Sequence, residues 1–378
     1  MNDIASALKP KSPSNEMMGL FNKTLAKYSL SEIAAHLGLN TGTVNRWTKT
    51  NNVPKSYKID LARMLITSHS NQLPDSLKKE LEKFYHNNTE REKDQFYTHS
   101  SVAKQCWEKF KRIATKTLNI DLAQYTFIEP AAGGGVFYKL LPSQRRIGID
   151  IEPKHPAISK QDYLCWRPPK NKNKYIVIGN PPFGLRGHLA LQFINYSYDF
   201  ADVVGFILPQ LFNSDGKGVP AKRVRGYQLA HTSKLQSNSF NYPDGKNVDV
   251  SAIFQVWTKI NTHKIASKRI QTCRDYIKVY SLSDGGTPSS TRNKAMLDKC
   301  DVYLPSTCFD EMRPYDNFEK LPHRRGYGVV ILKNYARIKK IFTHNDWGKT
   351  AFHSTNGALN LRTSLINEVI INHGFHDS

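Results

Sequence analysis

The chain has 378 residues, of which 39% are hydrophobic and 11% aromatic, enough apolar material for one large core and a smaller satellite domain. Its 54 Lys and Arg against 32 Asp and Glu leave a net charge of +22, which indicates a polyanionic partner, with nucleic acid as the first candidate. No apolar run approaches the ~18 residues that a membrane helix needs, so the composition excludes an integral membrane protein with apolar helices.

The cysteines and the first residues narrow the class further. Five cysteines, an odd number, are widely spaced and form no Cys-x-x-Cys pair, so we expect reduced thiols and no structural metal. Charged residues and prolines interrupt the first thirty positions, which therefore lack the apolar core of a signal peptide. We expect a cytoplasmic protein that associates with the nucleoid and not with a membrane.

Changes in the hydrophobic pattern divide the chain into five segments. A polar leader, 1–16, precedes residues 17–85, where apolar residues recur at the three- and four-residue steps of helices. A charged stretch, 86–94, is a predicted linker. Short apolar runs separated by helical or Gly/Pro-rich segments fill 95–264 and predict an α/β sheet. The pattern of the last segment, 265–378, does not assign a fold to it.

Residues 29–47, SLSEIAAHLGLNTGTVNRW, predict a helix-turn-helix. Ser31 can cap a first helix, Gly38 fits the tight turn, and Thr41 can begin a second helix. The pattern resembles the DNA-binding domains of repressor-type helix-turn-helix families, whose second helix enters the major groove. The alternative is a helical hairpin that serves only packing. The predicted DNA-reading side chains are Thr43, Asn45 and Arg46.

Ligand-binding positions follow three successive β-like runs. The run 125–128 leads into Glu-Pro-Ala-Ala-Gly-Gly-Gly at 129–135, a turn that lets a ligand approach the backbone, and then into a predicted helix at 136–141. Asp150 ends the second run, where a carboxylate would accept hydrogen bonds from ribose hydroxyls. Asp162 falls where a third strand should end, and Tyr163 or Leu164 could flank an adenine ring.

Two motifs resemble those of a known enzyme class. Residues 127–137, FIEPAAGGGVF, look like the first motif of the amino-methyltransferases that act on DNA, and residues 95–103, QFYTHSSVA, look like the motif that precedes it in the gamma subgroup. The resemblance implies a Rossmann-like class I methyltransferase sheet, S-adenosyl-L-methionine as cofactor and a target-recognition region after the catalytic domain. Gly134 departs from the Asp, Asn or Ser frequent in that class, which implies one fewer side-chain contact. The implied cofactor contacts are Phe96, Tyr97, Thr98, Glu129, Ala131, Gly133, Gly135, Asp150, Asp162 and Asn180.

The tetrad Asn180-Pro181-Pro182-Phe183 follows the apolar run 175–178. Its two prolines stiffen the turn and remove two backbone donors. The Asn180 amide oxygen and the Pro181 carbonyl can both accept hydrogen bonds from one amino group, which favours its lone pair as nucleophile toward a sulfonium methyl. Phe183 offers a π face to a base. Asn as the first residue resembles N6-adenine enzymes, whereas N4-cytosine enzymes more often begin with Ser.

Two further features surround the predicted catalytic site. The target base must leave the duplex stack, and Phe240 falls where the resemblance implies a second aromatic clamp on that base, with Tyr242 as a close rival. The basic, glycine-containing segment 213–234 is expected to close over the DNA backbone; the alternative is a solvated loop. Its predicted phosphate contacts are Lys222, Arg223 and Arg225.

The resemblance implies double-stranded DNA as a partner and a cognate restriction endonuclease within a restriction-modification system. The region 265–378 would then select the methylated site, with the basic residues Arg324, Arg325, Arg337, Lys339 and Lys340. The helix-turn-helix would read a separate sequence or add affinity, and would be dispensable for the chemistry. Two alternatives stay open: a methyltransferase for N4 of cytosine or for RNA, and a DNA-binding regulator whose methyltransferase domain is inactive.

Overall fold

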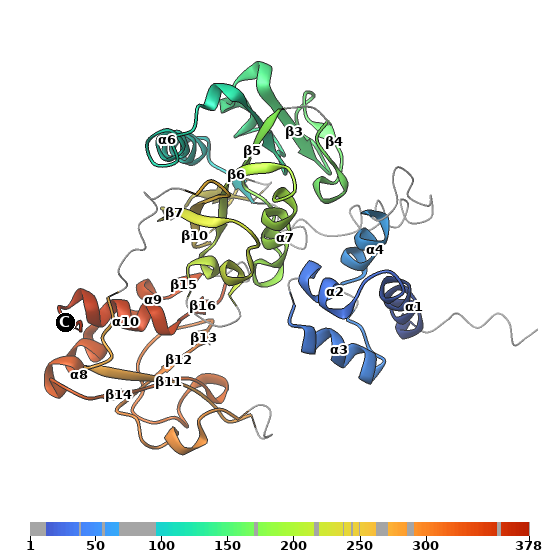
Figure 1. Ribbon diagram of the computed structural model, residues 1–378. Helices are drawn as coiled ribbons and strands as arrows, with labels where there is room; N and C mark the ends of the chain where they lie inside the picture. The colour runs from blue at the N-terminus through green and yellow to red at the C-terminus, as the bar shows by residue number, and fades with distance from the viewer. Residues whose placement is uncertain are drawn as a thin grey trace, which may run out of the picture. The chain divides into compact units, whose positions relative to one another are not determined.

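The computed structural model describes residues 13–37, 39–54, 57–67, 96–169, 173–214, 219–236, 238–242, 245–248, 250–261, 271–285, 291–353 and 357–377. They form two compact units (Figure 1). The first unit comprises residues within Met1–Gln95, Ala123–Phe206 and Arg223–Gln228. The second comprises residues within Phe96–Leu122, Ile207–Lys222 and Leu229–Ser378. The predicted linker 86–94 and the turn residue Gly38 lie outside the described residues.

The described residues of the N-terminal domain form four helices, and the first begins inside the predicted leader. Ser29 and Glu32 form a capping box at the start of the second helix: Glu32 N donates to the Ser29 hydroxyl at 3.2 Å, and Ser29 N donates to the Glu32 carboxylate at 2.8 Å. The predicted cap, Ser31, is therefore wrong, because an acid three residues after Ser29 completes the reciprocal bonds there. The helices are α1 (Pro13–Leu25), α2 (Leu30–His36), α3 (Thr41–Thr50) and α4 (Lys58–Thr67).

A seven-stranded sheet has the order β4-β3-β2-β5-β6-β10-β7, with β6 running from the first unit into the second. The pairs β3–β4, β2–β3, β2–β5 and β5–β6 are parallel. The strands progress from β2 toward β4 and then restart beside β2 with β5, which is the reversal that creates a ligand site in doubly wound sheets. The sheet confirms the predicted Rossmann-like class I methyltransferase fold. The strands are β2 (Tyr125–Glu129), β3 (Arg146–Asp150), β4 (Ser159–Lys160), β5 (Lys174–Gly179), β6 (Ala201–Pro209), β7 (Gln228–Lys234) and β10 (Ala252–Thr258).

The segment after the glycine-rich turn differs from the prediction. No α-helix spans 136–141; a single 3-10 turn, η3 (Tyr138–Leu140), stands there instead. Pro142 follows at once and cannot continue a helix, and the Tyr138 N–H is bound by the carboxylate of Glu129. The first α-helix after β5 is α7 (His188–Ser197), which begins directly after the predicted catalytic tetrad and its short turn.

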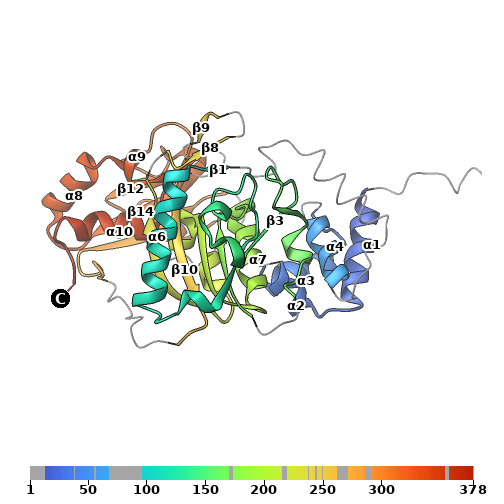
Figure 2. The same cartoon turned by 90° about the horizontal axis from the view of Figure 1, so that it is seen from above.

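The second unit holds one long helix, α6 (Ser100–Lys116), and a small antiparallel sheet of β1 (Tyr97–Thr98), β8 (Phe240–Asn241) and β9 (Asn247–Val248). The C-terminal region, which the sequence leaves unassigned, has two more antiparallel sheets, β11-β14-β12 and β13-β16-β15. Figures 1 and 2 show α8 and α10 beside the strands of the first of these, and their buried side chains share its core.

The C-terminal elements are β11 (Ile277–Ser283), β12 (Val302–Pro305), β13 (Thr307–Cys308), β14 (Arg325–Ile331), α8 (Tyr335–His344), α9 (Trp347–Thr350), β15 (Phe352–His353), β16 (Leu359–Asn360) and α10 (Thr363–Asn372). Among the helices that the structure describes, none has the length and apolar character to cross a membrane.

Candidate active site

The carboxyl ends of β2 and β5 lie side by side in the first unit. Ile128 of β2 pairs with Val177 of β5, so the residues that follow each strand emerge at the same edge of the sheet. Gly179 allows the two strand ends to approach closely, because a Cβ atom at this position would lie only 3.2 Å from Cγ of Glu129. Its φ of +157° is one that side chains rarely adopt. The tetrad that starts at Asn180 therefore begins directly beside the end of β2.

Glu129 ties the glycine-rich turn to the sheet. Its side chain is 1% exposed, and Oε2 accepts a hydrogen bond from Tyr138 N at 2.5 Å. Burial raises the pKa of this carboxyl well above its ordinary range, although the Tyr138 and Phe137 backbone N–H groups act in the opposite direction. Because its buried carboxylate binds the chain after the turn, Glu129 serves as a structural support for the turn.

Asp150 holds the same turn from β3. Its Oδ2 accepts from Gly133 N at 2.7 Å, and its Oδ1 accepts from Glu152 N at 2.7 Å. Burial raises the pKa of Asp150, and these two backbone donors partly offset the rise. Because each carboxylate oxygen has two lone pairs, the side chain can still accept hydrogen bonds from ribose hydroxyls.

The glycines between these two acids leave room for a ligand. A Cβ atom at Gly134 would meet nothing within 4 Å, so the turn is open on that side. Gly135 instead has φ +79°, and a Cβ there would lie 3.4 Å from the Ile158 side chain. A Gly-rich turn that is open at its centre and held at both ends fits the methionine part of the implied cofactor.

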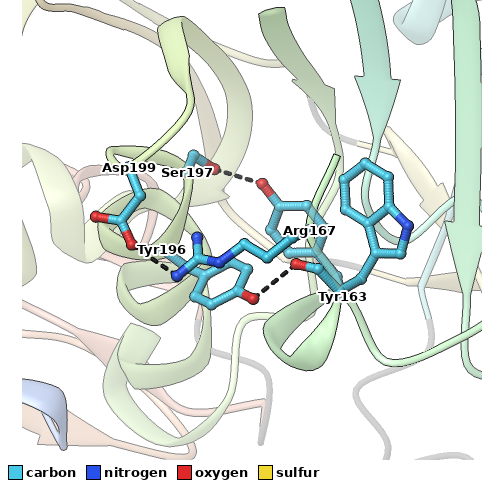
Figure 3. A network of polar contacts seen from close by, with 6 residues as sticks. Tyr163, Arg167, Tyr196, Ser197 and Asp199 are labelled. Atoms are coloured by element: carbon cyan, nitrogen blue, oxygen red, sulfur yellow. Dashed lines mark hydrogen bonds and ion pairs between the residues drawn. The ribbon is translucent and has the colours of Figure 1, made fainter. Parts of the chain in front are cut away.

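Asp162 caps a short turn, η5 (Tyr163–Cys165), by accepting from Leu164 N at 3.0 Å. Tyr163 is 1% exposed, and its hydroxyl lies 2.7 Å from Oγ of Ser197 on α7 (Figure 3). Its ring packs against Phe193, with the centroids 5.1 Å apart. Leu164, at 6% exposed, is buried as well, so neither residue suggested to flank an adenine ring has an open face, and that role stays a prediction.

A second set of contacts in Figure 3 fixes the chain after η5 to the end of α7. The Tyr196 hydroxyl donates to the Trp166 carbonyl at 2.6 Å, and the Arg167 guanidinium lies over the Tyr196 ring, 4.1 Å from its centroid. Arg167 also pairs with Asp199 at 2.7 Å. The end of α7 and the residues after it thus hold the segment that follows Asp162 in place.

The predicted catalytic tetrad adopts a tight, buried loop. Pro181 and Phe183 are buried, whereas Asn180 and Pro182 are half-buried. Ala190 N donates to the Phe183 carbonyl at 3.2 Å, which folds the loop back onto α7. Phe183 is only 2% exposed, so a base can stack on its ring only after its present neighbours move.

The turn that follows the tetrad is dominated by left-handed backbone. Gly184, Arg186 and Gly187 have φ values of +65°, +55° and +71°. A Cβ atom at Gly184 would lie 2.6 Å from Cβ of Leu189, so only glycine fits there. Arg186 is exposed and adopts this left-handed backbone although it is not a glycine. The sequence analysis did not single out this cation; the signal was the Gly-Leu-Arg-Gly run directly after the tetrad.

The second unit brings another group of predicted residues together. Strand β1 pairs with β8, which places Thr98 opposite Phe240 and Tyr97 opposite Asn241. Phe96 packs against Tyr242, with ring centroids 5.8 Å apart. Phe240 is fully buried, whereas Tyr242 is partly exposed. Of the two proposed base clamps, Tyr242 is therefore the one with an accessible ring.

The predicted DNA contacts lie on two surfaces. On α3, Asn45 and Arg46 are exposed and Thr43 is half-buried. In the basic segment, Asn195 of α7 accepts from Arg225 N at 2.9 Å and donates to the Arg223 carbonyl at 3.2 Å. Arg225 is exposed, Arg223 is half-buried and, in the second unit, Lys222 is exposed. Residues 215–218 of this segment lie outside the described part of the chain.

No protein-family model matches the chain, and no curated protein matches it. Among solved structures, a protein from Pyrococcus horikoshii described as an RNA methyltransferase is similar with a TM-score of 0.33 and 18% identity, over 46% of this chain and 91% of that one. The modification subunit of a type I restriction enzyme from Vibrio vulnificus gives a TM-score of 0.31 and 13% identity, over 68% of this chain and 60% of that one. Likenesses at these scores carry no conclusion about activity or partner.

Proposed function

We propose that the protein is an S-adenosyl-L-methionine-dependent DNA methyltransferase that modifies N6 of an extruded adenine and belongs to a restriction-modification system. The observation that carries this proposal is the position of the Asn-Pro-Pro-Phe tetrad. It leaves the carboxyl end of β5 directly beside the glycine-rich turn after β2. Transfer of a methyl group requires the nucleophile and the cofactor to be held next to each other. A loop that positions the nucleophile and a turn that binds the cofactor, both at one edge of the sheet, meet this requirement.

S-adenosyl-L-methionine would supply the methyl group, which its sulfonium makes electrophilic. Asp150 would accept hydrogen bonds from the ribose hydroxyls while it holds Gly133, and the open side of Gly134 would admit the methionine part. The motif resemblance assigns Phe96, Tyr97 and Thr98 to the cofactor as well. The net positive charge of +22 and the exposed cations of α3 suit a DNA substrate.

The tetrad would hold the adenine amino group. The amide oxygen of Asn180 and the carbonyl of Pro181 each accept a hydrogen bond from that group, which points its lone pair at the methyl carbon. The new N–C bond forms as the C–S bond breaks, and the amino group then releases one proton to solvent. No strong base is needed, since positioning and oriented acceptors provide the rate enhancement.

A variant of the tetrad tests this assignment. In Asn180→Ala we expect methyl transfer from labelled cofactor to DNA to fall by ~100-fold or more, because one of the two oriented acceptors is lost. Cofactor affinity, measured by calorimetry, should fall far less than the rate, because Asn180 is only one of the implied cofactor contacts. Asn22→Ala, on the exposed side of α1, is the matched control and should keep the wild-type rate. A wild-type rate for Asn180→Ala would contradict the proposed role.

A further inference from the structure

Within the first unit, the N-terminal domain contacts α7, the helix that follows the predicted catalytic loop. Gln192 Nε2 of α7 donates to Oδ1 of Asp60 on α4 at 3.2 Å and lies 3.4 Å from the His36 carbonyl at the end of α2. The other carboxylate oxygen of Asp60 lies 3.6 Å from Nε2 of His188. One acid of the helix-turn-helix domain thus contacts two side chains of α7.

This contact is buried and directional. Asp60 is 8% exposed and Gln192 is 6% exposed. A carboxylate removed from water is tolerated only where it has polar partners, so separation of the two helices would leave it poorly compensated. His188 and Gln192 are four residues apart and therefore share one face of α7. Polar contacts therefore join α4 to α7.

The contact lies directly after the predicted catalytic loop. His188 is the first residue of α7, and the left-handed turn Gly184–Gly187 directly precedes it. The Tyr57 ring lies edge-on to His188, with centroids 6.1 Å apart. Burial and the Asp60 charge raise the pKa of Tyr57, while the Arg186 and Arg223 charges lower it. The N-terminal domain therefore contacts the first residue of the helix that follows the loop.

We propose that Asp60 is a positioning residue for the predicted catalytic loop, an inference that rests on the proposed function. Its carboxylate fixes the first turn of α7 and, through the Ala190–Phe183 hydrogen bond, the placement of the tetrad. The N-terminal domain is then part of the catalytic framework. This departs from the expectation, drawn from the motif order alone, that the helix-turn-helix is dispensable for the chemistry.

Kinetic comparison of point variants of the full chain tests the proposal. In Asp60→Ala we expect kcat for methyl transfer to fall by on the order of ten-fold, because small misplacements of a reacting group are costly. The KM for cofactor should stay within about two-fold of wild type, since no cofactor contact is lost. Asp60→Asn keeps an acceptor oxygen for Gln192 and should recover most of the lost kcat. Gln192→Ala should resemble Asp60→Ala, and the double variant should be no worse than either single one.

Tyr28→Phe is the matched control. It removes the hydrogen bond from the Tyr28 hydroxyl to the Met64 carbonyl, 2.9 Å, which ties the same domain together without touching α7. We expect Tyr28→Phe to keep the wild-type kcat. Equal losses in Tyr28→Phe and Asp60→Ala would overturn the proposal, because they would indicate general destabilisation of the domain.

Hydrogen exchange supplies a readout that does not depend on activity. The Ala190 amide, bonded to the Phe183 carbonyl, should exchange faster in Asp60→Ala and at the wild-type rate in Tyr28→Phe and Asp60→Asn. Unchanged exchange together with an unchanged kcat in Asp60→Ala would contradict the positioning role. If Asp60→Ala fails to fold, Gln192→Ala carries the same test. If wild type transfers no methyl group, the proposed function fails, while exchange still decides whether Asp60 holds the loop.

Discussion

Glu129 and Asp150 occupy the ends of adjacent parallel strands, and each accepts a backbone N–H, from Tyr138 for Glu129 and from Gly133 for Asp150. Burial is the largest influence on each and raises both pKa values. The two groups differ in their exposure to solvent. Glu129 is 1% exposed and accepts from the chain after the turn, whereas Asp150 is half-buried and is the one proposed to bind ribose. The sequence identified both acids, but not that the first of them is a structural tie.

The raised pKa of Asp150 predicts a pH dependence of cofactor binding. A ribose hydroxyl donates to the ionised carboxylate, and ionisation of Asp150 is shifted to higher pH than for an ordinary carboxyl. Affinity for S-adenosyl-L-methionine should therefore rise with pH through the range above the ordinary value of ~3.9 and then level off. Calorimetry over that range measures it.

Asp150→Asn is the control for this pH dependence. It keeps the side-chain shape but cannot ionise, so its affinity should be lower than that of the wild type above the raised pKa and should vary less with pH. Equal pH dependence in the two proteins would show that another group is responsible and would remove Asp150 from the ribose site.

At the scale of elements, α7 connects most parts of the predicted site. His188 in its first turn and Gln192 contact Asp60, Asn195 holds the basic segment, and the Ser197 hydroxyl shares a hydrogen bond with that of Tyr163. The catalytic loop enters it directly. One helix thus contacts the tetrad, the segment that carries Asp162 and the N-terminal domain. These contacts agree with the burial of most of its residues from Ala190 to Ser197.

Tyr163→Phe tests the structural role of the cluster in Figure 3. Loss of the 2.7 Å contact with Ser197 should lower the free energy of unfolding by about 1 kcal/mol, the usual net value of such a hydrogen bond. Cofactor affinity should not change, because the buried ring has no face for adenine. Urea unfolding and calorimetry measure the two quantities.

Ser197→Ala provides the reciprocal control. Since the two hydroxyl groups form one contact, the double variant should lose less stability than the sum of the single variants. A large loss of cofactor affinity in Tyr163→Phe, with little loss of stability, would return this residue to the ligand site.

Local sequence predicted the elements whose signals are local. The apolar runs before Glu129, Asp150 and Asn180 became β2, β3 and β5. The helix expected at 136–141 was wrong because the prediction could not include the competing bond from Tyr138 to Glu129. The C-terminal region escaped assignment because its sheets pair distant segments, such as Ile277 with Ile331. Likewise, nothing around Asp60 signalled its contact with α7, which exists only in the folded chain.

For the whole molecule, the basic residues first considered for target recognition are partly committed to internal contacts. Arg324 pairs with Asp284 at 2.7 Å, the Arg337 guanidinium lies 5.3 Å from the Phe375 ring centroid, and Lys339 donates to the Asp301 carbonyl. These three side chains therefore stabilise the C-terminal region as well as adding positive charge. Selection of the DNA site by this region remains a proposal, and exposed residues such as Phe309 are further candidates for contact.

The central claim is that this chain transfers a methyl group to N6 of adenine in DNA. Its most direct test is to incubate the full-length protein with S-adenosyl-L-methionine and unmethylated genomic DNA, digest the DNA to nucleosides and identify the products by mass spectrometry. The account predicts N6-methyladenine with the wild-type protein and a strongly reduced amount with Asn180→Ala. N4-methylcytosine as the product, or no methylated nucleoside from a protein that binds the cofactor, would contradict it.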